Sequence, residues 1–145
     1  MMNELRGLWR GKHAVGKGNT WVEGFLANRA EKNAQIISIE DGWTKYVATK
    51  TLGECTGLCD KNGKLIFEGD ILLAGDGDTY VVEYRGSWSG FVGRQFGGNP
   101  NYNPFLFTVA YQCEVIGNIH DNPELLNATG EDIGNAAQDV LMPAT

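Results

Sequence analysis

The residues best suited to bind a metal ion are the cysteines Cys55, Cys59 and Cys113 together with His120. Structural zinc sites usually combine two Cys or His pairs, with two to four residues between paired cysteines. Cys55 and Cys59 have such a spacing, but six residues separate Cys113 from His120. Because this second spacing does not fit the zinc pattern, we predict ordinary free thiols, with no metal and no cofactor.

The histidines His13 and His120 are the candidates for general acid–base catalysis. A hydrolytic mechanism would pair one of them with a cysteine or with a carboxylate such as Asp70 or Glu83. No nucleophile elbow, HExxH motif or paired-carboxylate spacing accompanies them. Asp70 and Asp121 fit turn and cap positions better. We therefore predict no enzymatic activity and no catalytic residues. A small hydrolase that uses one of the two histidines is kept as a third hypothesis.

The stretch 85–104 offers a binding surface instead. Arginine next to aromatic rings is suited to stacking on bases or on peptide side chains, and both residue types are enriched at interface hot spots. The competing interpretation is that Trp88 and Phe91 fill the core and leave a passive loop. We predict a long partner-binding loop with the contact residues Arg85, Trp88, Phe91, Arg94 and Tyr102.

These residues need a scaffold, and the sequence predicts one made mostly of short strands. The chain has 20 glycines, scattered among turn signals such as Asp41-Gly42 and Asn62-Gly63. Helix signals appear only near the C-terminus, at 122–126 and from Thr129 onward. Alternating and β-branched segments predict strands at 6–11, 20–26, 35–39, 43–49, 65–67, 71–73, 79–84, 105–111 and 115–119.

Composition narrows the class of protein further. With 145 residues, 42% of them hydrophobic, the chain can bury a core of its own. Its formal net charge of −6 disfavours nonspecific nucleic-acid binding, which usually needs a basic face. No apolar run approaches the ~20 residues of a membrane span. The start of the chain has no signal-peptide pattern, and the odd number of cysteines suggests reduced thiols, so we expect a cytoplasmic protein without membrane association.

Several blocks together carry a family resemblance. The central ones are TGL at 56–58, DKNGK at 60–64, FEGDI at 67–71 and YVV at 80–82. They are preceded by RG at 6–7 and WVEGFL at 21–26, and followed by VIGNI at 115–119 and NPELL at 122–126. In this order, over roughly residues 5–127, the blocks resemble the YopX family. Cys55, Cys59, the stretch 85–104 and the segment after Asn127 depart from the family pattern.

The resemblance implies a protein of bacteriophages or prophages. It also implies a small β-rich protein whose C-terminal half is an SH3-like barrel. It brings no assigned reaction and no agreed catalytic residues. We therefore expect a mostly β fold, with an N-terminal β-meander packed on a small SH3-like barrel and short C-terminal helical segments. The expected divisions are a meander at 1–53, the barrel at 54–127 and a tail with a short helix at 128–145.

For function, we predict a non-enzymatic phage or prophage accessory protein that works through protein binding or assembly in the bacterial host cytoplasm. Its partner is an unidentified phage or host protein. The alternative is a single-stranded nucleic-acid binder, since small barrels with exposed aromatic residues suit that task. We also expect a homo-oligomer, because the chain has many large aromatic residues for its size, with four Trp, six Phe and five Tyr.

Overall fold

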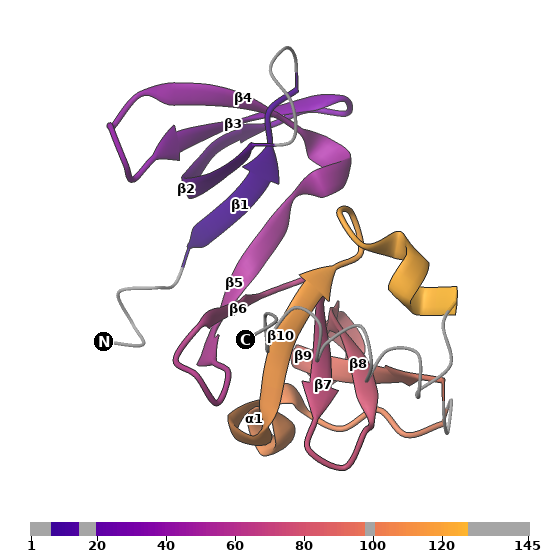
Figure 1. Cartoon of the computed structure of the whole chain (residues 1–145). Coiled ribbons are helices and arrows are strands. Elements are labelled where there is room, and N and C mark those ends of the chain that lie inside the picture. The colour runs from indigo at the N-terminus through magenta and orange to yellow at the C-terminus, as the bar shows by residue number, and fades with distance from the viewer. Residues whose placement is uncertain (1–6, 15–19, 98–100, 128–145) are drawn as a thin grey trace, which may run out of the picture. The chain divides into compact units, whose positions relative to one another are not determined.

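The computed structural model describes residues 7–14, 20–97 and 101–127, and within them the chain is mostly β. The chain divides into two compact units, residues 1–57 and 58–145 (Figure 1). The strands form two antiparallel sheets, one with the order β4-β3-β2-β1-β5-β6 and one with the order β10-β7-β8-β9. The prediction of a mostly β protein is therefore confirmed.

The first unit begins with four consecutive antiparallel strands. They are β1 (Leu8–Lys12), β2 (Trp21–Arg29), β3 (Asn33–Ser38) and β4 (Thr44–Ala48). A short 3₁₀ turn at Thr49–Thr51 leads into β5 (Gly53–Cys59), which pairs with β1 through Trp9 and Glu54. The sequence segment that forms β5 was not predicted as a strand.

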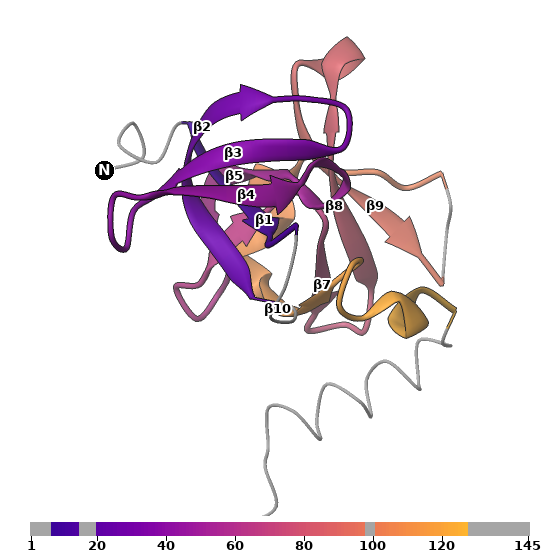
Figure 2. The same ribbon diagram turned by 90° about the horizontal axis from the view of Figure 1, so that it is seen from above.

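The first sheet curls back on itself, as the view from above shows (Figure 2). A bridge joins His13 to Val47, and the N–H of Ala14 donates to the carbonyl of Tyr46 at 3.0 Å. Glycine permits this close approach: a Cβ added at Gly11 would lie 2.7 Å from Cγ2 of Val47. Inside the curl lies a small buried cluster of Val22, Ala34, Ile36 and Val47.

The second unit contains the remaining strands and the helical turns. Its strands are β6 (Leu65–Phe67), β7 (Asp70–Ala74), β8 (Thr79–Arg85), β9 (Gly90–Phe96) and β10 (Cys113–Asn118). Its helical turns are a 3₁₀ turn at Gly86–Trp88, the helix α1 (Leu106–Val109), a 3₁₀ turn at Ala110–Gln112 and a last one at Pro123–Asn127. Within the described residues, no helix has the length and apolar character to cross a membrane.

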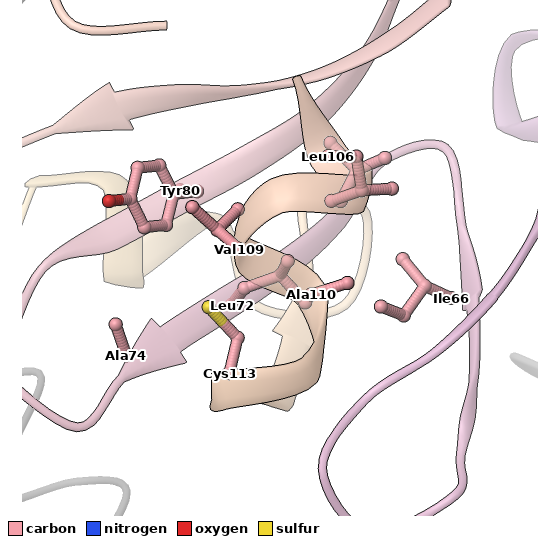
Figure 3. Packing of buried hydrophobic residues seen from close by; sticks show 9 residues of the cluster. Ile66, Leu72, Ala74, Tyr80, Leu106, Val109, Ala110 and Cys113 are labelled. Carbon is pink, nitrogen blue, oxygen red and sulfur yellow. The ribbon is translucent and has the colours of Figure 1, made fainter. Parts of the chain in front are cut away.

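The core of the second unit forms where α1 covers its strands. Figure 3 shows Leu106, Val109 and Ala110 from the helical segment facing Leu72 and Cys113. The spacing of the three helical residues puts them on one side of a helix. Among the described residues, the buried cluster consists of Ile66, Leu72, Ala74, Tyr80, Val82, Leu106, Val109, Ala110 and Cys113.

Two local predictions are wrong. The segment 105–111 was predicted as a strand, but it forms α1 and the following 3₁₀ turn. The stretch 85–104 is predicted as a long loop, but β9 occupies the middle of this stretch and pairs with β8. The helix predicted in the tail 128–145 lies outside the described residues.

Candidate interaction surface

The predicted contact residues lie around the hairpin of β8 and β9. Arg85 ends β8, and the chain turns through Gly86–Trp88. Ser89 completes the turn with φ of 53°, a left-handed conformation that a non-glycine residue seldom adopts. The register that follows pairs Tyr84 with Phe91 and Val81 with Arg94. The turn therefore fixes which side chains share a face of the hairpin.

The alternation of the strands divides the predicted residues between two faces. Phe91 shares a face with Tyr84, and their rings are in edge contact with centroids 5.3 Å apart. Phe91 is partly buried and packs against the core cluster of the second unit. Arg94 lies on the opposite face, together with Val81 and Glu83. The structure thus separates Phe91 from the two arginines.

On the face that carries the arginines, exposed aromatic side chains form a continuous row. The guanidinium of Arg85 lies over the ring of Trp88, 5.1 Å from its centroid. Trp88 contacts Phe105 with centroids 5.6 Å apart, and Phe105 stacks on Phe107 at 5.8 Å. The exposed fractions are 44% for Trp88, 40% for Phe105 and 67% for Phe107. We call Arg85, Trp88, Phe105 and Phe107 the aromatic ridge.

Next to the ridge, Glu83 interacts with two arginine side chains. Its carboxylate accepts a hydrogen bond from Nε of Arg94 at 2.5 Å, and its other oxygen lies 3.9 Å from a terminal nitrogen of Arg85. One carboxylate thus faces two guanidinium groups. The local balance is positive in a chain whose total charge is negative. Such a site favours a partner with an anionic or an aromatic group.

Tyr102 lies away from the ridge. Its ring contacts that of Tyr80, with centroids 6.4 Å apart, and burial raises the pKa of Tyr80 above its ordinary value. The backbone around Tyr102 runs along the edge of β9. The N–H of Gly93 donates to the carbonyl of Pro104 at 2.9 Å, and that of Gln95 donates to Tyr102 at 3.4 Å. This segment covers the strand that carries Arg94.

Sequence reasoning missed Phe105 and Phe107. The pattern Phe-Leu-Phe at 105–107 is also that of a strand with Leu106 on the outside. In the structure Leu106 is fully buried, and both phenylalanines are exposed. The spacing of Leu106, Val109 and Ala110 could have indicated this arrangement. On a helix these three residues share one apolar side that faces the core, and the two phenylalanines then face outward.

The other candidate residues are not assembled into a catalytic or metal site in the described parts of the chain. No group of at least three His, Cys, Asp or Glu side chains there is arranged to hold a metal ion. Cys55 and Cys113 are buried, Cys59 is exposed, and all three are free thiols. Burial raises the pKa of the Cys113 thiol to about 11. Asp70 is buried and accepts a hydrogen bond from the N–H of Phe67, which is a turn role.

A pocket of about 450 Å³ lies in the first unit, at one end of its curled sheet. His13 lines it, next to groups of both charge signs such as Glu23 and Lys45. Trp21 also lines the pocket, and the guanidinium of Arg10 lies over the Trp21 ring, 4.7 Å from its centroid. His13 thus has a carboxylate among its pocket neighbours, while the three cysteines do not line this pocket.

The fold and the ridge together define a small, mostly β protein that presents aromatic side chains from the β8–β9 turn and from the start of α1. A family model described as YopX protein matches residues 15–127. The chain therefore belongs to the YopX family. No curated protein matches the chain significantly.

Proposed function

We propose that this chain is a non-enzymatic phage or prophage accessory protein that binds another protein through the aromatic ridge. The observation that carries the proposal is the continuous contact from Arg85 through Trp88 and Phe105 to Phe107, with each ring substantially exposed. Exposed Trp and Arg at one place are typical of interface hot spots. The resemblance to phage and prophage proteins supports the biological setting.

The second unit serves in this proposal as an SH3-like scaffold. Its antiparallel strands β7 to β10 and the covering helix α1 support this role. The ridge stands at the β8–β9 turn and at the start of α1, and the buried side chains of Leu106 and Val109 anchor α1 in the core. A rigid scaffold with recognition residues at its connections is a common arrangement for binding proteins. The free thiols support a reducing bacterial cytoplasm as the site of action.

A single-stranded nucleic acid is the second candidate partner. The stacking of Arg85 on Trp88 favours it, because bases stack on such platforms. The net charge of −6 weighs against it, and because Glu83 pairs with both arginines, only one uncompensated positive charge remains beside the ridge for contacts with phosphates. We therefore place a protein partner first.

Affinity capture tests this proposal. The tagged chain is expressed in bacteria during phage infection, and captured proteins are identified with and without nuclease treatment. We expect a partner protein that withstands nuclease and is lost with Trp88→Ala and with Phe107→Ala. The matched control is Tyr111→Ala, since Tyr111 is 69% exposed and close in sequence but does not belong to the ridge.

The same experiment separates the candidates. Retention of the partner by a Trp88→Ala, Phe107→Ala double variant would move the binding surface elsewhere. If nuclease releases all captured proteins, and if the chain binds oligonucleotides with an affinity that falls steeply with salt concentration, the hypothesis of a nucleic-acid partner is favoured.

A further inference from the structure

The outer face of the first unit carries an apolar patch that the buried cluster inside the curl does not use. Phe25 on β2 lies directly opposite Ile37 on β3, and Tyr46 on β4 lies opposite Gln35. Ile39 continues the outer row of β3, since its N–H donates to the carbonyl of Glu23. The exposed fractions are 48% for Phe25, 40% for Ile37, 54% for Ile39 and 58% for Tyr46. We call these four residues the outer patch.

The outer patch is large for a unit of this size. With roughly 200 Å² for each large side chain, its exposed part is on the order of 400 Å². Patches of about 300–600 Å² on single chains are often functional. A stable interface buries about 800 Å² on each partner, so the outer patch supplies about half of that area and a polar rim must supply the rest.

The rim at the two ends of the patch has opposite charge. The end formed by the β2–β3 connection carries Arg29, Lys32 and Lys50 against a single Glu31. Lys50 belongs to this end, because the N–H of Thr49 donates to the carbonyl of Lys32. All four charged side chains are exposed.

The other end, at the β3–β4 turn, carries Glu40 and Asp41, both exposed. Lys45 forms an ion pair with Asp41 at 2.9 Å, so the net charge of the turn itself comes from Glu40. The exposed Glu23 on β2, next to Ile39 and opposite Arg10, adds a second carboxylate near this end. On the side of β1, Arg10 and Lys12 lie over the ring of Trp21, at 4.7 and 5.6 Å from its centroid, beyond the apolar rows. The charge therefore changes sign along β3, from basic at its start to acidic after its end.

We propose that the outer patch binds the same patch of a second copy of this chain. In a two-fold dimer, the same surface is used twice and one copy is reversed relative to the other. Reversal along β3 brings the acidic turn of one copy to the basic end of its partner and keeps Ile37 near the centre. Two sheets packed face to face in this way lie about 10 Å apart and exclude water from the apolar side chains.

The charge pattern selects a second copy over an unrelated partner. A surface that is basic at one end and acidic at the other is complementary to its own reverse. Both chains carry −6, so their overall charges repel each other, and the attraction must come from close contacts at the two ends. Opposite charges across the rim would then set the orientation of the dimer.

The first test removes the apolar centre. Light scattering or sedimentation of the full chain at tens of micromolar should give a dimer mass. Phe25→Thr combined with Ile37→Thr keeps strand-forming residues in place and should weaken association more than about tenfold. Tyr84→Thr is the matched control, because Tyr84 is 52% exposed on a strand of the other unit. Circular dichroism checks that each variant is folded.

The second test reverses the charges. Lys32→Glu alone and Glu40→Lys alone each place like charges together twice in a two-fold dimer, so both should shift toward monomer. Mixed in equal amounts, the two variants should recover a heterodimer, because each contact is again between opposite charges. Wild-type monomer at these concentrations, or a dimer that persists in the Phe25, Ile37 variant, would overturn the proposal. Failure of the mixture to recover dimer would overturn the reversed orientation on which it rests.

Discussion

The carboxylate of Asp60 accepts a hydrogen bond from the backbone N–H of Val115, at 3.0 Å and across 55 positions of the chain. Its other oxygen accepts from the N–H groups of Asn62 and Lys64, each at 2.9 Å. Asp60 is 7% exposed, so these bonds are made largely away from water. One side chain therefore shapes the turn before β6 and also fixes the position of β10.

The first prediction concerns this link. Asp60→Ala should destabilise the chain by about 3 kcal/mol, because hydrogen bonds to a charged group contribute about 1.5–3 kcal/mol each and three partly buried N–H groups would lose their acceptor. Chemical denaturation measures the change. Asp76→Ala is the control, since the Asp76 carboxylate accepts an exposed bond from the N–H of Asp78, only two residues along the chain; it should cost no more than about 1 kcal/mol. Equal losses would show that the long-range bond adds nothing.

The second prediction concerns Gly24, where β2 and β3 approach closely. A Cβ at this position would overlap the carbonyl oxygen of Ile37, a clash with the backbone that a rotamer change cannot relieve. Gly24→Ala should therefore cost more than about 3 kcal/mol or prevent folding. Gly75→Ala is the matched control, because no atom of the described residues lies within 4 Å of a Cβ there. Thermal unfolding of both variants tests this, and similar melting temperatures would contradict it.

The third prediction separates packing from recognition at the β8–β9 hairpin. Phe91→Ala should lower the free energy of unfolding by about 2–3 kcal/mol, because Phe91 packs on the core. Arg94→Ala should lower it by only about 0.5 kcal/mol, since the ion pair with Glu83 is partly exposed. Trp88→Ala should cost about 1 kcal/mol or less. A larger loss from Trp88→Ala than from Phe91→Ala would assign Trp88 to the core.

The fourth prediction concerns alkaline pH. Burial raises the pKa of Cys113 from its ordinary value of 9.0 to about 11, so the unfolded chain loses this proton before the folded chain does. Stability is unaffected by this group below pH 9 and should fall as the pH rises from about 9 to 11. Denaturation curves across this range measure the fall. Cys113→Ala should make it shallower, whereas Cys59→Ala, at an exposed position, should leave it unchanged.

The fifth prediction uses the thiols as probes. Under reducing conditions followed by removal of the reductant, a thiol reagent should modify Cys59 rapidly in the native chain, because Cys59 is exposed. Cys55 and Cys113 are buried and should react only after denaturation. Mass spectrometry of digested protein gives the site of labelling. Rapid native labelling of Cys113 would mean that the core of the second unit opens readily.

The sequence predicts strands well where turn chemistry is explicit. Gly42, Gly63 and Gly77 all have positive φ, as turn glycines should, and strands flank each of them. The sequence does not predict the strand β9, because Gly90 and Gly93 interrupt the alternating pattern that is typical of a strand. A Cβ at Gly93 would lie 3.1 Å from the ring of Tyr80, so this glycine makes room for an aromatic side chain. That reason is invisible without the neighbouring strand.

The candidate surface was predictable only in part. Arg85 and Trp88 come together because they are close in sequence, and contacts between such residues can be predicted from the local sequence pattern. Phe105 joins them through a bridge to Val92, a contact that depends on how the chain returns to β9. Phe91 and Tyr102 do not share this surface, because strand alternation and the return path of the chain place them elsewhere. Long-range pairing, more than composition, decides which aromatic residues share a face.

The return of residues 101–105 along β9 has a consequence for recognition. An uncovered outer strand offers a row of backbone donors on which a foreign peptide can be added as a further strand. In this protein the N–H groups of Gly93 and Gln95 already donate to Pro104 and Tyr102. A ligand arriving beside Trp88 and Phe105 therefore finds this backbone occupied at those positions. It must be held by its side chains, and its specificity will depend on their shape and aromatic character more than on an extended main chain.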